Sequence, residues 1–100
     1  MLTRRAKHDL IDIGDYIAYT LMEPVTSRNF IRGLRKSIGS LDEMPERYEV
    51  ICDEELMKRQ IRCMPYKNYY VFYEIIEISE MVIILRVGYN RRNWKEILLK

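Results

Sequence analysis

The stretch from Lys67 to Trp94, KNYYVFYEIIEISEMVIILRVGYNRRNW, decides the fold of this chain. It holds two apolar runs, Tyr69 to Ile78 and Met81 to Val87, on either side of the polar break Ser79-Glu80. Tyrosine, valine, phenylalanine and isoleucine dominate both runs, and such residues pack well on a pleated surface. The stretch therefore predicts a β-hairpin, whose second strand leads into the basic and aromatic segment Tyr89 to Trp94.

The first half of the chain predicts a helix over residues 4–22. Thr3 is suited to cap its first turn, because a threonine hydroxyl accepts a hydrogen bond from an amide that has no partner in the helix. Apolar residues recur at helical spacing and make one stripe to bury: Ala6, Leu10, Ile13, Ile17 and Leu21. Pro24 is expected to end this helix, since the residue before a proline is pushed out of the helical region.

A second helix is predicted from about Thr26 to Met44, with Pro45 as its stop. Its apolar stripe consists of Phe30, Leu34, Ile38 and Leu41. Gly33 and Gly39 each cost about 1 kcal/mol of helix propensity relative to alanine, which close helix packing would offset. The short link between the two helices predicts an antiparallel helix hairpin.

Downstream, the acidic segment Pro45 to Glu55 predicts a loop, and Lys58 to Tyr66 alternates like a half-buried strand. Ile61 and Cys63 are expected on one face of that strand, with Arg62 and Met64 on the other.

In the hairpin's second strand, the odd positions Ile83, Leu85 and Val87 make a continuous apolar face that we assign to the helices. Pleat geometry then places Arg86 on the opposite face, with Val82 and Ile84.

These elements predict an α+β fold in which an N-terminal antiparallel helix hairpin packs on a C-terminal three-stranded antiparallel sheet. Residues 1–100 are expected to form a single domain, since this length supports one core. Residues 95–100 are expected to form a last helical turn or a frayed tail.

Composition excludes several classes of protein. No apolar run approaches the roughly 18 residues that a bilayer span requires, and the charged start MLTRRAKHDL lacks the apolar stretch of a signal peptide, so we expect a cytoplasmic protein without membrane contact. Cys52, Cys63 and His8 are the only cysteines and histidine, which predicts neither a metal site nor a cofactor; two reduced thiols are favoured over a disulfide.

The net charge of +2 conceals a segregation along the chain. Counted from the sequence, residues 1–36 carry +3, residues 37–57 carry −6 and residues 58–100 carry +5. A basic C-terminal part beside an acidic middle indicates a positive surface for an anionic partner, although scattered solvated charge is the alternative.

Five motifs resemble the RelE/ParE superfamily, the toxins of bacterial type II toxin–antitoxin pairs. They are A-x-x-D-L-x-x-I-x-x-Y-I at residues 6–17, L-x-x-x-P at 41–45, Ile61-Arg62, N-Y-x-V-F-Y at 68–73 and I-L-R-V-x-Y-x-R-R at 84–92. Their order and spacing cover nearly the whole chain. The resemblance implies a short first strand, two helices and three antiparallel strands, in agreement with the elements above.

Two features depart from that family. Relatives begin with a strand of several residues, whereas only Met1, Leu2 and Thr3 precede the first predicted helix, so the N-terminal edge strand is expected to be short or absent. Some relatives that cleave RNA carry a histidine near the C-terminus as general acid, and the one histidine here is His8.

The resemblance implies either a ribosome-dependent ribonuclease that cleaves mRNA or an inhibitor of DNA gyrase. Cleavage at the 2′-hydroxyl needs groups that stabilise a phosphorane, and fixed guanidinium groups suit that task. The candidate catalytic residues are Arg62, Arg86, Tyr89 and Arg91, with Lys67 and Arg92 as nucleic-acid-binding residues. We expect mRNA cleavage as the leading function.

Two of these side chains also have a structural interpretation: Arg62 would pair with Glu74 across the sheet, and Arg86 would be a solvated residue on an exposed strand face. The absent histidine favours the alternative, a non-enzymatic inhibitor of gyrase. A third class is an inactive relative that acts only as a DNA-binding regulator together with its antitoxin. The expected partners are a cognate antitoxin, drawn to the basic residues 58–100, and either the ribosome with mRNA or gyrase.

Overall fold

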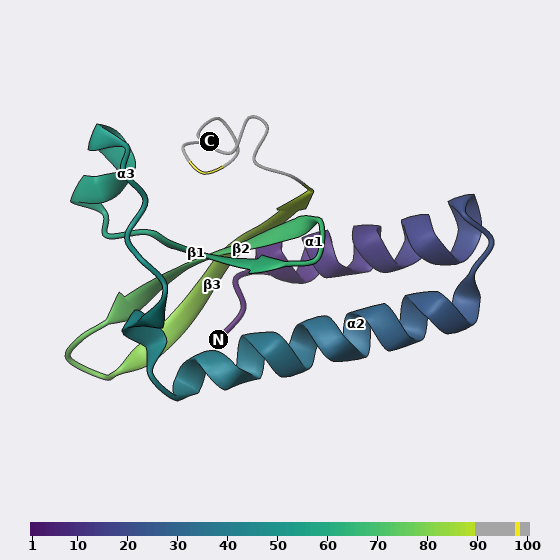
Figure 1. Cartoon of the computed structure of the whole chain (residues 1–100), viewed down its shortest axis with the longest axis horizontal. Helices are drawn as coiled ribbons and strands as arrows, with labels where there is room; N and C mark the ends of the chain where they lie inside the picture. The colour runs from purple at the N-terminus through teal and green to yellow at the C-terminus, as the bar shows by residue number, and fades with distance from the viewer. Residues whose placement is uncertain (90–97, 99–100) are drawn as a thin grey trace.

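The computed structural model describes residues 1–89 and Leu98. Two helices, α1 (Arg4–Asp15) and α2 (Pro24–Gly39), run antiparallel and side by side, and three strands follow them (Figure 1). The strands are β1 (Arg62–Tyr66), β2 (Tyr69–Ile76) and β3 (Met81–Tyr89), in the order β1-β2-β3, with both pairs antiparallel. The predicted α+β architecture is confirmed.

The first helix is capped as predicted but is not uniform. The amide of Ala6 donates to the Thr3 hydroxyl at 3.1 Å, and α1 then passes into a π-helical turn, η1 (Tyr16–Thr20). The chain reverses at Met22, which has a φ of 56°.

The second helix begins and ends earlier than predicted. Pro24 occupies its first turn, where the missing N–H has no helical partner to lose, so the proline starts α2 as well as ending the helix before it. After Gly39 the chain tightens into the short helix η2 (Ser40–Asp42), and Met44 stands in a left-handed conformation before η3 (Pro45–Arg47).

The acidic middle is more ordered than the predicted loop. A short helix, α3 (Glu54–Lys58), follows Asp53, whose carboxylate accepts from the amide of Glu55 at 3.1 Å. The predicted strand start at Lys58 is therefore wrong, because Lys58 ends this helix and β1 begins only at Arg62.

Both edges of the sheet are covered by backbone that comes from outside it. At the β1 edge, Val50 forms an antiparallel bridge to Arg62, and the Ile51 amide donates to the Ile61 carbonyl at 2.8 Å. At the β3 edge, Leu2 forms a parallel bridge to Ile84. The expected N-terminal edge strand is thus short, and it protects an edge that would otherwise offer unpaired backbone groups.

The predicted faces of β3 are right for Arg86 and Val87 but wrong from Val82 to Leu85, because the ladder contains a bulge. Phe72 pairs with Arg86, but the next residue, Tyr73, pairs with Ile84, so Leu85 is an extra residue on β3. The bulge shifts the alternation by one position. Val82, Ile84 and Val87 face the helices, whereas Leu85 packs on the other side of the sheet.

The core accordingly has two parts. The main cluster joins the stripes of both helices to one face of the sheet, around the buried residues Leu10, Leu34 and Tyr73. A smaller cluster lies on the opposite face, where Ile61, Phe72 and Leu98 are buried together. The face opposite to the helices therefore also carries a small buried cluster.

The glycines of α2 do not mark helix–helix packing. A Cβ on Gly33 would overlap the hydroxyl of Tyr66 on β1, and a Cβ on Gly39 would meet nothing within 4 Å. The close approach of the helices is instead at Gly14, whose carbonyl accepts from the buried Ser27 hydroxyl at 2.7 Å.

None of the four glycines serves a left-handed turn. Among residues 1–89, five other residues have φ between 52° and 56°, and each lies in a connection between elements: Met22, Met44, Gln60, Lys67 and Glu80.

The two glycines of α2 give the first prediction. Gly39→Ala should raise the free energy of unfolding by about 0.5–1 kcal/mol, because alanine has fewer unfolded conformations and meets open space. Gly33→Ala should lack this gain because of the Tyr66 hydroxyl, and the Gly33→Ala/Tyr66→Phe double variant should regain part of it. Urea unfolding of the four proteins measures the effect; equal gains at both glycines would contradict the close contact.

Candidate functional site

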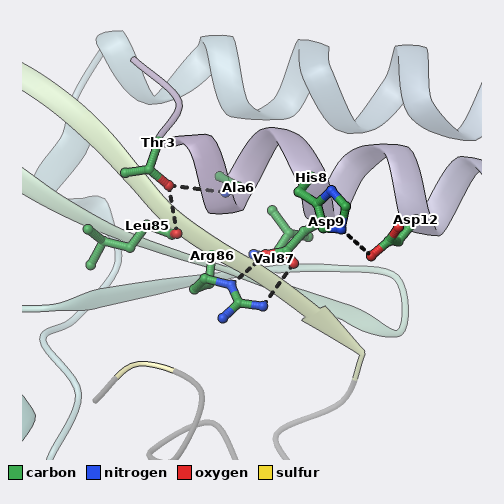
Figure 2. A network of polar contacts seen from close by, with 8 residues as sticks. All are labelled: Thr3, Ala6, His8, Asp9, Asp12, Leu85, Arg86 and Val87. Carbon is green, nitrogen blue, oxygen red and sulfur yellow. Dashed lines mark hydrogen bonds and ion pairs between the residues drawn. The ribbon is translucent and has the colours of Figure 1, made fainter. Parts of the chain in front are cut away.

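The carboxylate of Asp9 joins α1 to the end of β3. Its two oxygens accept from Nε and Nη2 of Arg86 at 2.8 and 2.9 Å, and Oδ2 also accepts from the backbone amide of Val87 at 2.9 Å (Figure 2). Asp9 is only 8% exposed. The hydrogen bond to Asp9 raises the pKa of Arg86 above its ordinary value. Arg86, a predicted catalytic residue, is thereby bound within the fold.

Thr3 holds the bulge from the same side. Its hydroxyl caps α1 and also donates to the carbonyl of Leu85 at 2.9 Å, so the extra residue of β3 has a partner (Figure 2). The Thr3 amide donates to the carbonyl of Ile84 at 3.0 Å. Thr3 and Asp9 together fix the part of β3 that leads to Tyr89.

Arg62 is also bonded inside the molecule. Its Nη1 donates to the backbone carbonyl of Tyr48 at 2.6 Å and to that of Glu46 at 3.3 Å. The alternative pairing of Arg62 with Glu74 is wrong, because Arg59 takes that carboxylate, with 3.6 Å between Nη2 and Oε1. Arg62 therefore ties the acidic segment to β1.

Lys67 and Tyr89 lie at the two ends of an aromatic row. Tyr89 contacts Tyr69 edge to face at 5.3 Å, and Tyr69 contacts Phe30 at 5.4 Å between ring centroids. The Lys67 ammonium lies 5.3 Å from the Phe30 ring and 5.7 Å from the Tyr66 ring, a cation–π geometry. A hollow of about 150 Å³ next to the row is lined by Lys67, Asn68, Tyr70 and Tyr89. Of the predicted site residues, the structure brings Lys67 and Tyr89 together.

A larger cavity of about 650 Å³ lies on the other side of Tyr89. Asp9 and Val87 line it together with three tyrosines, Tyr16 of η1, Tyr69 and Tyr89. Burial raises the pKa of Tyr69, and the neighbouring phenols of Tyr89 and Tyr16 raise it further. The Tyr69 phenol therefore stays protonated at neutral pH and cannot serve as a general base there.

Tyr73 anchors the same segment that Arg62 binds. The Tyr73 hydroxyl donates to the carbonyl of Pro45 at 2.6 Å, and its side chain is fully buried. Burial raises the pKa of Tyr73 to about 12, although the positive charges of Arg62 and Arg47 oppose this shift.

The remaining predicted site residues, Arg91 and Arg92, and the predicted last turn at residues 95–100 lie outside the described residues, apart from Leu98, which is helical. Sequence reasoning missed Asp9, although the aspartate stands at a fixed place in the A-x-x-D-L motif. Its position off the apolar stripe made it look solvated, and only the tertiary fold shows its contact with β3.

A model of the family described as the ParE toxin of the type II toxin–antitoxin system, parDE, matches residues 1–94. The chain belongs to the ParE toxin family. A search of curated proteins found no match.

Membership confirms the predicted RelE/ParE superfamily and makes the chain the toxin component of a type II toxin–antitoxin system, with a cognate antitoxin as the implied partner. No helix in the described part of this ParE-family chain is long and apolar enough to cross a bilayer. Within the same residues, no three of the His, Cys, Asp and Glu side chains are grouped so that they could hold a metal ion.

The Asp9 contacts predict a large effect of one substitution. Asp9→Ala should lower the free energy of unfolding by about 3 kcal/mol, because it leaves the Arg86 guanidinium and the Val87 amide without their acceptor. Asp12→Ala is the matched control on the same helix, since Asp12 makes only an exposed pair with His8 and should matter by less than about 0.5 kcal/mol. Denaturant unfolding compares them, and similar losses would argue against the bridge.

Tyr73 predicts a dependence of stability on alkaline pH. The pKa of Tyr73 in the folded state, about 12, exceeds the ordinary value of 10.0. The contribution of Tyr73 to the free energy of unfolding is therefore fully present below pH 10 and is lost as the pH rises from 10 towards 12. Tyr73→Phe should lower the free energy of unfolding by about 1 kcal/mol at pH 8. The difference between the variant and the unaltered protein should shrink above pH 10. Thermal unfolding at several pH values tests this, with the exposed Tyr19→Phe as control; a constant difference would refute it.

Proposed function

We propose that this toxin arrests growth by binding DNA gyrase as a protein ligand, without catalysing a reaction of its own. The observation that supports this most is the engagement of the predicted catalytic arginines. Arg86 is bound by Asp9, and Arg62 by the carbonyls of Tyr48 and Glu46. A guanidinium that stabilises a phosphorane must turn its donors to the substrate phosphate. Here Nε and Nη2 of Arg86 and Nη1 of Arg62 already donate to acceptors of the fold.

The surroundings of Tyr89 also favour a binding role over a catalytic one. Tyr89 is 64% exposed and contacts the ring of Tyr69. Burial raises the pKa of the Tyr69 phenol, which therefore stays protonated. General acid–base catalysis needs a group that titrates near the working pH within hydrogen-bond reach of the reacting atom. The described residues that line the two hollows beside Tyr89 offer three phenols, the Asn68 amide, the Lys67 ammonium and the carboxylates of Asp9 and Asp12. Asp9 is already bonded to Arg86 and Val87, and Asp12 pairs with His8. Such a surface suits binding better than proton transfer.

Ribosome-dependent mRNA cleavage is the second candidate. The hollow beside Lys67 favours it, because an ammonium group, the Asn68 side chain and the exposed Tyr89 ring together suit a phosphate and a stacked base. In that mechanism, Tyr89 and Lys67 are the contacts to RNA, and Arg91 and Arg92 supply further positive charge.

Two assays run in parallel separate the candidates. Purified toxin is added to gyrase with relaxed plasmid, and separately to a translating extract in which mRNA integrity is followed. The proposal expects inhibited supercoiling and intact mRNA. Discrete mRNA breaks with unaffected supercoiling would overturn it in favour of cleavage, and the absence of any growth defect on expression without antitoxin would favour the inactive class.

Tyr89→Phe sharpens the comparison, because it removes the phenolic oxygen and keeps the ring. A gyrase ligand should retain its inhibition of supercoiling, whereas a ribonuclease that transfers a proton through Tyr89 should lose cleavage. Tyr19→Phe, on the exposed η1 segment, is the control for loss of a surface hydroxyl.

A further inference from the structure

The cavity of about 650 Å³ beside Tyr89 combines a buried apolar floor with an aromatic mouth. Ile13, Ile17 and Val87 line it and are buried. Tyr16 and Tyr89 also line it, but they are 50% and 64% exposed. The cavity therefore offers hydrocarbon at its base and aromatic rings to a ligand that enters from solvent.

Three tyrosines surround the mouth of this cavity. The rings of Tyr69 and Tyr89 lie with 5.3 Å between their centroids and 72° between their planes, so they form two walls of a corner. Tyr16 lies near the same corner: burial raises the pKa of Tyr69, and the neighbouring phenols of Tyr89 and Tyr16 raise it further. The face of an aromatic ring carries partial negative charge and attracts a cation placed over it. Such a corner suits an organic cation.

The other polar groups of the cavity also favour positive charge. Asp9 and Asp12 lie about one turn apart on α1, and both line the cavity (Figure 2). Asp9 pairs with Arg86, whereas Asp12 makes an exposed pair with His8 at 3.5 Å. The carbonyl end of α1 and η1, which is the negative end of the helix dipole, reaches the cavity at Leu21. Among the described residues, no lysine, arginine or histidine lines it.

We propose that this cavity binds a quaternary ammonium group, with its methyl groups against the rings of Tyr16, Tyr69 and Tyr89. Its positive charge then lies near the Asp12 carboxylate, and the alkyl part of the ligand contacts the apolar floor. Binding of this group does not require that the target of the toxin be gyrase.

A quaternary ammonium group fits this cavity better than a primary amine does. A primary ammonium carries three N–H donors, and each of them needs an acceptor once water is displaced. The carboxylate of Asp9 already accepts from Arg86 and Val87, and the floor of the cavity is hydrocarbon. A trimethylammonium group donates no hydrogen bond, so ring faces and one nearby negative charge satisfy it.

Choline and two analogues test the charge and the methyl groups separately. The first analogue, 3,3-dimethylbutan-1-ol, replaces the nitrogen of choline by carbon, and the second, ethanolamine, replaces the trimethylammonium group by a primary ammonium. Each probe is titrated with the full chain while its proton NMR signals are followed. We expect choline to bind at least fivefold more tightly than either analogue. Its methyl signal should move upfield, because the methyl protons lie over ring faces.

Two hexapeptides distinguish a free ligand from a group carried by a protein. One contains Nε-trimethyllysine, and the other contains unmodified lysine at the same position. The trimethylated peptide should bind at least fivefold more tightly than the unmodified one, and its affinity relative to that of choline identifies the source of the group. Equal binding of the two peptides would contradict recognition of the methyl groups.

Variants of the lining locate the binding. Tyr16→Leu should weaken choline binding at least threefold because it removes a ring, whereas Tyr16→Phe keeps the ring and should change the Kd less than twofold. Asp12→Asn should weaken binding at least threefold through loss of the negative charge. The matched controls are Tyr19→Leu and Asp15→Asn, at exposed residues outside the cavity, and should change the Kd less than twofold. Circular dichroism checks that each variant is folded.

The site is overturned if choline does not bind, if choline binds no more tightly than its carbon analogue or ethanolamine, or if Tyr16→Leu and Tyr19→Leu weaken binding equally. Because these titrations contain the toxin alone, a failure to inhibit gyrase would leave their outcome unchanged.

Discussion

The hydrogen bonds of the Asp9 carboxylate hold the two halves of this fold together. A buried carboxylate needs several donors to offset its lost hydration, and Asp9 finds them in the Arg86 guanidinium and the Val87 amide. The same group satisfies the open edge of β3, next to the backbone bridge from Leu2. One side chain therefore joins α1 to β3, pairs with a half-buried cation and satisfies an amide of the β3 edge. Because the pairing also sets the direction in which β3 ends, the environment of Tyr89 depends on it.

Local patterns predicted the architecture well. The helical stripes, the Thr3 cap and the hairpin are properties of short stretches, and the structure confirms each of them except at Leu21. Leu21 was predicted to be buried but is 51% exposed, because the helix has ended before it. The faces predicted for Val82 to Leu85 of β3 were wrong because a bulge cannot be read from alternation. Every residue from Met81 to Leu85 is apolar, so the sequence offers no mark of where the period shifts. The Thr3 hydroxyl stabilises the bulge by donating to the carbonyl of Leu85, a contact between residues far apart in the chain.

The candidate site shows the same division between local and long-range information. The count of charges along the sequence shows which segments are basic, but it does not show which arginines form hydrogen bonds and ion pairs within the fold. Arg62 and Arg86 serve the fold by binding carbonyls and a carboxylate, and Arg59 serves it by pairing with Glu74. By contrast, the arginines of α2 were assigned no role from the sequence, yet all of them are exposed. For a toxin of the ParE family, whose action depends on partners, this difference decides which charges are available to them.

The turns of this protein have a practical consequence. Met22, Met44, Gln60, Lys67 and Glu80 all adopt a left-handed backbone conformation that costs side-chain-bearing residues about 1 kcal/mol or more. The chain thus contains a set of surface positions where glycine or asparagine would relieve strain without disturbing the core. Combined at Met22, Met44 and Gln60, away from the Tyr89 surface, such exchanges form a rational route to a sturdier protein for crystallisation. They also give natural variants of this toxin room to absorb destabilising changes elsewhere, such as those that alter partner choice.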